Sequence, residues 1–244
     1  MWHLEKATVS DDAVAERFFG QAVDLDPTFA DAYCGLAETQ TRAAVVFNTR
    51  GLADAQNSVE TSARLAVALD GSNAVAHACL SVALFLRGDH HGALVEAERA
   101  LTSSPNLASG YWRRGQALIF SGQPQEGLKD LRTSIALEPR GVSLAHRLTQ
   151  VAAGYYFSRT YEDAVEASKN VIRSFPNFPP PYRWLAAALG QLGRFDEANA
   201  ALEQGLLVSP TLFDLLSRGH PPWIRPQDQA HLLEGLRKAG MPEE

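Results

Sequence analysis

The sequence is poor in the residues that disulfide frameworks and metal sites require. Its 244 residues include only two cysteines. Cys34 and Cys79 lie in no CxxC pattern, so we expect two reduced packing residues. The adjacent histidines His90 and His91 have no carboxylate or thiol partner at the spacing of metal ligands. We therefore predict no disulfide, no metal site and no cofactor.

Long apolar runs and catalytic motifs are missing as well. No stretch approaches the roughly 18 apolar residues that a membrane span needs, and residues 1–12 lack the apolar core of a signal peptide. These absences predict a cytoplasmic protein that does not enter a membrane. The chain also contains no GxSxG, GxxxxGK[ST], HExxH or GxGxxG motif. We therefore expect no enzyme.

Positive charge is in short supply. The 22 lysine and arginine residues are outnumbered by 28 aspartate and glutamate residues, which gives a net charge of −6. A surface that follows nucleic-acid phosphates or anionic lipid should be basic overall. The composition therefore predicts that neither nucleic acid nor a membrane surface is the partner.

What the sequence does contain is a repeat. Residues 74–105 and 108–139 align with each other, with Gly88 opposite Gly122 and Pro105 opposite Pro139. Residues that end helices recur near this interval along the chain, at Pro27, Gly71, Pro105, Pro139, Pro176 and Pro210. A fixed period of about 34 residues is typical of a stacked repeat array.

Each unit has the pattern of two helices. Small or apolar residues recur at helical spacing, most clearly at Ala198, Ala201, Leu202, Gly205 and Leu206. Glycine-containing turns interrupt the pattern in mid-unit, and the small residues allow the two helices to approach closely. The sequence therefore predicts an all-α solenoid whose core grows with each unit.

The spacing of Tyr182, Ala186, Gly193, Phe195 and Pro210 resembles the tetratricopeptide repeat (TPR) consensus. The resemblance implies a right-handed superhelix of stacked helix–turn–helix units with a concave groove. The expected division is a partial repeat at 1–27, a repeat with an insertion at 28–71, repeats at 74–107, 108–141, 142–178 and 179–212, and a half repeat with a capping helix at 213–244.

Three departures from the period are expected to alter the array. About ten extra residues around 45–56 predict a lengthened first helix or a loop. Three extra residues near 155–158 predict an extra helical turn. An amphipathic helix that begins at Pro226 and stops at Gly240 is expected to cap the last unit.

The TPR resemblance places one face of each unit's first helix in the groove. The apolar part of this face consists of Val82, Phe85 and Leu86. The polar and aromatic part consists of Trp112, Arg113, Gln116, His146, Arg147, Gln150 and Arg183.

Two interpretations of the polar part stay open. Guanidinium groups suit carboxylates, so an acidic peptide could bind across the arginines with Trp112 as its anchor. Alternatively the arginines are solvated or paired with acidic groups such as Glu138. The apolar part is expected to be covered by a partner helix, by a second copy of the chain or by the 45–56 insertion.

The leading functional prediction is a non-catalytic scaffold that binds a peptide or partner helix, as the regulatory region of a bacterial signalling protein. The alternative is an oligomerisation or sensor module of an adenylate cyclase-like or transcription-regulator protein, with self-association through the N-terminal partial repeat or the apolar groove. The ends WHLEKAT and HPPWIRPQ resemble the C-terminal repeats of bacterial class III adenylate cyclase-like regulators. An RNA-binding helical repeat is a third and weaker prediction.

Overall fold

The computed structural model describes residues 8–141, 143–214 and 221–242, and every regular element within these ranges is a helix. The helices are α2 (Val9–Leu25), α3 (Ala30–Val45), α4 (Leu52–Leu69), α5 (Ala74–Leu86), α6 (His90–Ser103), α7 (Ala108–Ser121), α8 (Pro124–Leu137), α9 (Leu144–Phe157), α10 (Tyr161–Ser174), α11 (Pro180–Gln191), α12 (Phe195–Val208) and α14 (Pro226–Lys238).

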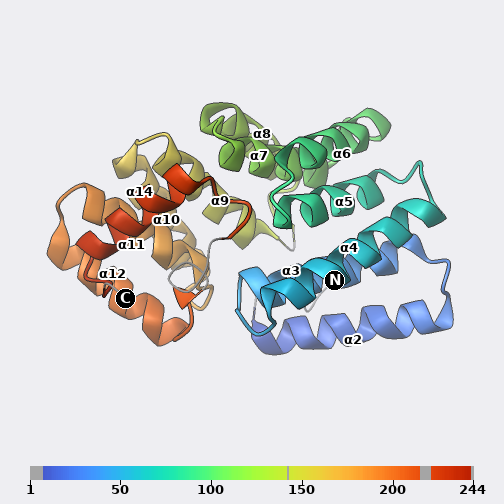
Figure 1. Cartoon of the computed structure of the whole chain (residues 1–244), viewed down its shortest axis with the longest axis horizontal. Coiled ribbons are helices and arrows are strands. Elements are labelled where there is room, and N and C mark those ends of the chain that lie inside the picture. The colour runs from blue at the N-terminus through green and yellow to red at the C-terminus, as the bar shows by residue number, and fades with distance from the viewer. Residues whose placement is uncertain (1–7, 142, 215–220, 243–244) are drawn as a thin grey trace.

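Successive helices pair into hairpins that follow an arch. The hairpins are α3/α4, α5/α6, α7/α8, α9/α10 and α11/α12, each packed on the next. Helices α2–α4 form one foot of the arch, α7 and α8 its top, and α11 and α12 the other foot (Figure 1). The prediction of an all-α solenoid of helix–turn–helix units is confirmed.

Small residues set the distance between the two helices of a hairpin. A Cβ atom on Gly127 of α8 would lie 2.5 Å from the carbonyl oxygen of Gly115 in α7, so only glycine allows this approach. In the preceding unit Ser81 donates a hydrogen bond of 2.7 Å to the carbonyl of Ala93. The turn glycines Gly88 and Gly122 have φ values of 81° and 99°, a conformation that L-residues rarely adopt.

The extra residues of the first complete unit lengthen both helices and the loop between them. Helix α3 has 16 residues and α4 has 18, and residues 46–51 connect them. The expected extra turn near residues 155–158 is wrong, because α9 and α7 both have 14 residues. The additional residues of that unit lie in the connections before and after α9, so they do not lengthen the helix.

The loop after α3 joins the two feet of the arch. Val46 and Phe47 pack into one apolar cluster with Ala145, Val171 and Phe178, which belong to the fourth complete unit or to the connection that follows it. The Asn48 side chain donates to the carbonyl of Thr211 at 3.4 Å. The superhelix is therefore closed across its open side by its own first unit.

The C-terminal segment, residues 221–238, runs back along the inner ends of the first helices. Trp223 lies 5.9 Å from Phe85 of α5 between ring centroids, and Arg225 donates to the carbonyl of Ser121 at the end of α7. Farther along, the carbonyl of His231 accepts from Tyr156 of α9 at 2.8 Å. The segment thus touches the units in order from α5 to α11.

Helix α14 begins at Pro226, as the sequence predicted, and it lies on α11 (Figure 1). It reaches α9 through the hydrogen bond from Tyr156 to the carbonyl of His231. Its apolar residues Leu232 and Leu236 are fully buried. The close crossing is possible because α11 and α14 meet at glycines, Gly190 and Gly235. The amphipathic helix therefore covers the inner face of the array more than its end.

The glycine contact between α11 and α14 gives a direct test of this packing. A Cβ atom on Gly190 would lie 2.2 Å from the carbonyl oxygen of Gly235, so Gly190→Ala should lower the free energy of unfolding by about 1–3 kcal/mol. Gly20→Ala in α2 is the matched control, because its Cβ would meet no atom within 4 Å and it should stabilise the helix by about 0.5–1 kcal/mol. Chemical denaturation measures both. Equal stability of Gly190→Ala and the parent would contradict the crossing.

Candidate functional site

The inner face of the arch is the candidate binding groove, and the structure buries nearly all of its predicted residues. Trp112 is 3% exposed, Phe85 3% and Arg147 1%. Val82, Leu86, Arg113, Gln116, His146 and Gln150 are buried as well, and Arg183 is partly buried. The structure brings these residues together along α5, α7, α9 and α11, but it covers them with the chain itself.

A buried ion pair connects the first foot of the arch to its top. Glu38 of α3 pairs with Arg113 of α7, and its second carboxylate oxygen accepts from Ser143 at 3.4 Å. Burial alone would raise the pKa of Glu38, but the positive charges of Arg113 and Arg42 outweigh it and hold the pKa below its usual range. The carboxylate therefore stays ionised and holds Arg113 in the interior.

Trp112 lies at the centre of the aromatic part of the face. The Arg113 guanidinium stacks on its ring at 3.6 Å from the centroid, and its indole N–H donates to Gln150 Oε1 at 2.8 Å. The His146 ring packs edge-on against it. Desolvation lowers the pKa of His146 to about 3, so this imidazole is neutral at neutral pH.

Arg147 points away from the groove toward the preceding unit. Its Nη1 donates to the carbonyl of Ser134 at 3.1 Å, and Nη2 pairs with Glu138 at 2.9 Å. The alternative interpretation, in which an arginine pairs with Glu138, therefore describes this residue. Arg113 and Arg147 are engaged inside the chain, and binding of an acidic peptide to them stays a prediction.

The apolar part of the groove is covered by two segments of the same chain. Phe85 packs against Phe120 and Trp223, and Val45 reaches the same cluster from the end of α3. The 45–56 insertion was expected from the sequence as one possible cover of this apolar part, and Val45 at its start does contact the cluster. Residues 221–224 were missed as a groove lining, although Trp223 and Ile224, two bulky apolar residues beside prolines, were the available signal.

A cavity of about 60 Å³ remains inside the covered groove. It is lined by polar side chains of α7, α9 and α11 and closed by aromatic and apolar ones. The lining includes Gln116, His146, Thr149, Gln150, Arg183, Phe85, Phe120, Trp184, Trp223, Ile224 and Val46.

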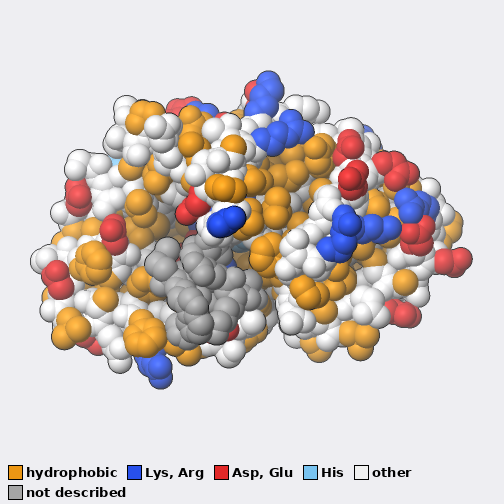
Figure 2. Space-filling view, turned by 180° about the vertical axis from the view of Figure 1, so that it is seen from behind, with side chains coloured by type: hydrophobic (Ala, Val, Ile, Leu, Met, Phe, Trp, Pro, Cys, Tyr) orange, Lys and Arg blue, Asp and Glu red, His pale blue; other side chains and the backbone are white. Residues whose placement is uncertain are grey.

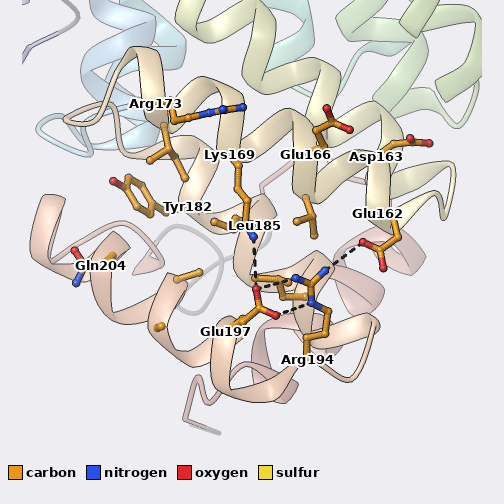
Figure 3. A pocket seen from close by; sticks show the side chains of 15 residues that line it. Glu162, Asp163, Glu166, Lys169, Arg173, Tyr182, Leu185, Arg194, Glu197 and Gln204 are labelled. Atoms are coloured by element: carbon orange, nitrogen blue, oxygen red, sulfur yellow. Dashed lines mark hydrogen bonds and ion pairs between the residues drawn. The ribbon is translucent and has the colours of Figure 1, made fainter.

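A larger hollow of about 800 Å³ lies on the outer side, between α10 and α12 with α11 as its floor (Figure 3). Its floor is apolar, with Tyr182 and Leu185 at the base. Arg194 spans it through ion pairs with Glu162 and Glu197. These charges satisfy one another at the solvent-exposed rim, so they offer little to orient a ligand.

Among the described residues, the face of the molecule shown in Figure 2 carries no broad basic surface of the kind that binds nucleic acid. Figure 2 shows lysine and arginine side chains in small groups among acidic ones, without a broad basic patch outside the grey atoms. No helix in the described ranges is long and apolar enough to cross a membrane.

The family model for the tetratricopeptide repeat matches residues 74–99 and 179–204. The TPR repeat-containing protein YpiA of Bacillus subtilis (strain 168) is 32% identical over 87 residues, which are 35% of this chain. These two matches support a tetratricopeptide-repeat protein. The matched stretch spans only 20% of YpiA.

Solved TPR structures share this fold. A chain of the APC/C hetero-tetramer Cut9–Hcn1 matches 95% of this chain and 44% of its own length, with a TM-score of 0.62 and 17% identity. A thermophilic TPR protein of Thermus thermophilus matches 74% of this chain and 92% of its own length, with a TM-score of 0.58 and 19% identity. These likenesses concern the fold alone. The resemblance of the two ends to adenylate cyclase-like regulators stays a prediction.

Removal of the Glu38 charge tests the ion pair that spans the groove. Glu38→Gln should lower the free energy of unfolding by about 3–5 kcal/mol, because it leaves the Arg113 guanidinium buried without its counter-charge. Glu162→Gln is the matched control, since it breaks an ion pair whose carboxylate is 70% exposed and should change stability by less than about 0.5 kcal/mol. Urea denaturation measures both. Equal effects of the two variants would contradict a structural role for Glu38.

His146 predicts a pH dependence of stability. Its pKa is about 3 when folded, against an ordinary value of 6.5, so below pH 6.5 the unfolded chain binds a proton that the folded chain does not. Stability should therefore fall as pH drops from about 6.5 toward about 3, by up to about 1.4 kcal/mol per pH unit from this group. Denaturation of the parent and His146→Gln at several pH values isolates this contribution. A slope that is identical in both proteins would contradict it.

Proposed function

We propose that the chain is a non-catalytic scaffold that binds a segment of another protein along its inner face. The single observation that supports this function is the occupation of the groove by residues 221–238. A turn that contains Trp223 and the helix α14 lie across successive units, as a segment of a bound partner would.

The groove offers the chemistry that such a ligand needs. Trp223 supplies a buried aromatic side chain against Phe85, whose ring in turn packs edge-on against Phe120. Helix α14 supplies an apolar stripe through Leu232 and Leu236. Polar contacts to Ser121 and Gln191 fix the position of the segment along the array. A partner with a similar anchor and amphipathic helix would replace the segment and bind in its place.

The internal segment sets the affinity for such a partner. A partner binds only the fraction of molecules whose groove is open, so a stable closed form weakens the apparent affinity in proportion. We further propose that the partner segment is acidic and that the scaffold acts in bacterial signalling. The Cut9–Hcn1 structure, which has a similar fold, is a hetero-tetramer, and this supports a scaffold function for the present chain.

A synthetic peptide of residues 221–239, added in trans to the full chain, tests the proposal. It should bind Trp223→Ala saturably and at least about 10-fold more tightly than it binds the parent, because loss of a buried tryptophan weakens the internal competitor by about 3–5 kcal/mol. Titration calorimetry measures the affinities.

Phe195→Ala is the matched control, because this aromatic residue on α12 is 56% exposed and lies outside the groove. It should bind the peptide no better than the parent does. Failure of the peptide to bind Trp223→Ala at all would show that the groove does not accept a segment in trans, and the proposed function would be wrong.

A further inference from the structure

The outer side of α10 carries a stripe of four exposed charges. Glu162, Glu166, Lys169 and Arg173 follow one another at spacings of four, three and four residues, which places them on one face of the helix. All four line the outer hollow between α10 and α12. Figure 3 shows the two glutamates toward one end of α10 and the two basic residues toward the other. The stripe is therefore acidic in its first half and basic in its second.

The chain itself compensates these charges poorly. In the described ranges neither Glu166 nor Arg173 forms an ion pair, and the Arg173 guanidinium donates to the side-chain oxygen of its neighbour Asn170. Lys169 does not pair with Glu166 but approaches Glu197 of α12, at the long distance of 3.5 Å. An opposite charge from outside the chain could therefore engage each half of the stripe.

The helix dipole accounts for only part of the charge order. It favours Glu162 in the first turn and Arg173 in the last turn, but its effect falls off within one turn of each end. Glu166 and Lys169 lie farther inside the helix. Like charges that are four residues apart, Glu162 with Glu166 and Lys169 with Arg173, also repel each other. The isolated helix therefore gains little from having its charges separated into two halves.

The stripe is complementary to a reversed copy of itself. The midpoint between Glu162 and Arg173 falls between residues 167 and 168, and so does the midpoint between Glu166 and Lys169. Two α10 helices that pack antiparallel about a two-fold axis at this midpoint bring Glu162 of one copy opposite Arg173 of the other. The same axis brings Glu166 opposite Lys169. Each contact of a two-fold interface occurs twice, so both pairs form at both ends.

The same two-fold axis, perpendicular to α10, turns the two outer hollows toward each other. The floor of each hollow is apolar, with Tyr182 and Leu185 at its base. Floors that face each other are shielded from bulk water, which adds an apolar contribution to the association. A single exposed ion pair on the rim is too weak to orient a small ligand, but several pairs in one register select a partner and its orientation.

We propose that a second copy of the chain binds this outer face, with the two α10 helices antiparallel. Glu162 of each copy pairs with Arg173 of the other, and Glu166 pairs with Lys169. The surface lies on the other side of the array from the covered groove, so this interaction goes beyond the proposed function and does not depend on it. Because its ion pairs are exposed, the dimer is reversible and weakens as salt is added.

Sedimentation velocity of the full chain over a concentration series at low ionic strength tests the interface. The parent should dimerise, and Glu166→Lys or Lys169→Glu alone should weaken the dimer at least about 10-fold, because each sets like charges opposite each other twice. The double variant should recover the parent's affinity to within about 3-fold, since opposite charges meet again. Lys129→Glu on α8 is the matched control; this lysine is 67% exposed outside the hollow, and its reversal should change dimerisation by less than about 2-fold.

Two variants of opposite charge make the test independent of the parent dimer. Glu162→Lys with Glu166→Lys makes the stripe wholly basic, and Lys169→Glu with Arg173→Glu makes it wholly acidic. Each variant should be monomeric alone, and an equimolar mixture should form a heterodimer. Circular dichroism checks the fold, and the exposure of all four positions predicts the helix content of the parent.

Three results would overturn the proposal. The parent could stay monomeric at every concentration in low salt, or its dimer could survive both single reversals, which would place the contact elsewhere. A double reversal that fails to restore the dimer would contradict the antiparallel register. None of these measurements involves the peptide titration of Trp223→Ala, so the dimer and the proposed function can fail separately.

Discussion

The buried pair of Glu38 and Arg113 is the interaction on which the closed shape of the arch depends. It joins α3 to α7 across the inside of the superhelix, in a position that an open TPR array would leave to solvent or ligand. Because Glu38 also accepts from Ser143, the pair fixes the first unit against the third and fourth together. With that distance set, the loop residues Val46 and Phe47 reach the cluster around Phe178.

Closure turns the groove into an interior. A covered TPR groove loses its open solvent space, and its polar groups must then be paired within the chain. Arg113 and Arg147 follow this rule through carboxylates, and Trp112 follows it through Gln150. Arg183 has no carboxylate partner among the described residues and donates instead to the carbonyl of Leu212. The same reasoning explains why the larger outer hollow, with its rim of exposed ion pairs, is the weaker candidate for a ligand site.

Much of the fold could be predicted from the sequence because it follows from local patterns. Gly88 and Gly122 at turns, prolines at unit ends and small residues at Gly115 and Gly127 each act over a few residues, and the array repeats them. The residues of the inner face were predicted from the resemblance to the TPR consensus. Their burial was not, since it depends on contacts between residues far apart in the chain, such as Trp223 with Phe85. The repeat pattern also could not distinguish the environment of Arg183 from that of Arg113. Arg113 has a carboxylate partner only because the superhelix brings Glu38 close to it.

Residues 221–238 occupy the groove as a ligand would, and photo-cross-linking tests this arrangement most directly. With p-benzoylphenylalanine in place of Trp223 in the full chain, irradiation should produce links within the same molecule. Links are expected to the ends of α5 and α7 near Phe85 and Phe120, which line the same cavity as this side chain. Links mainly to another molecule, or to residues on the outer side of the arch, would contradict it.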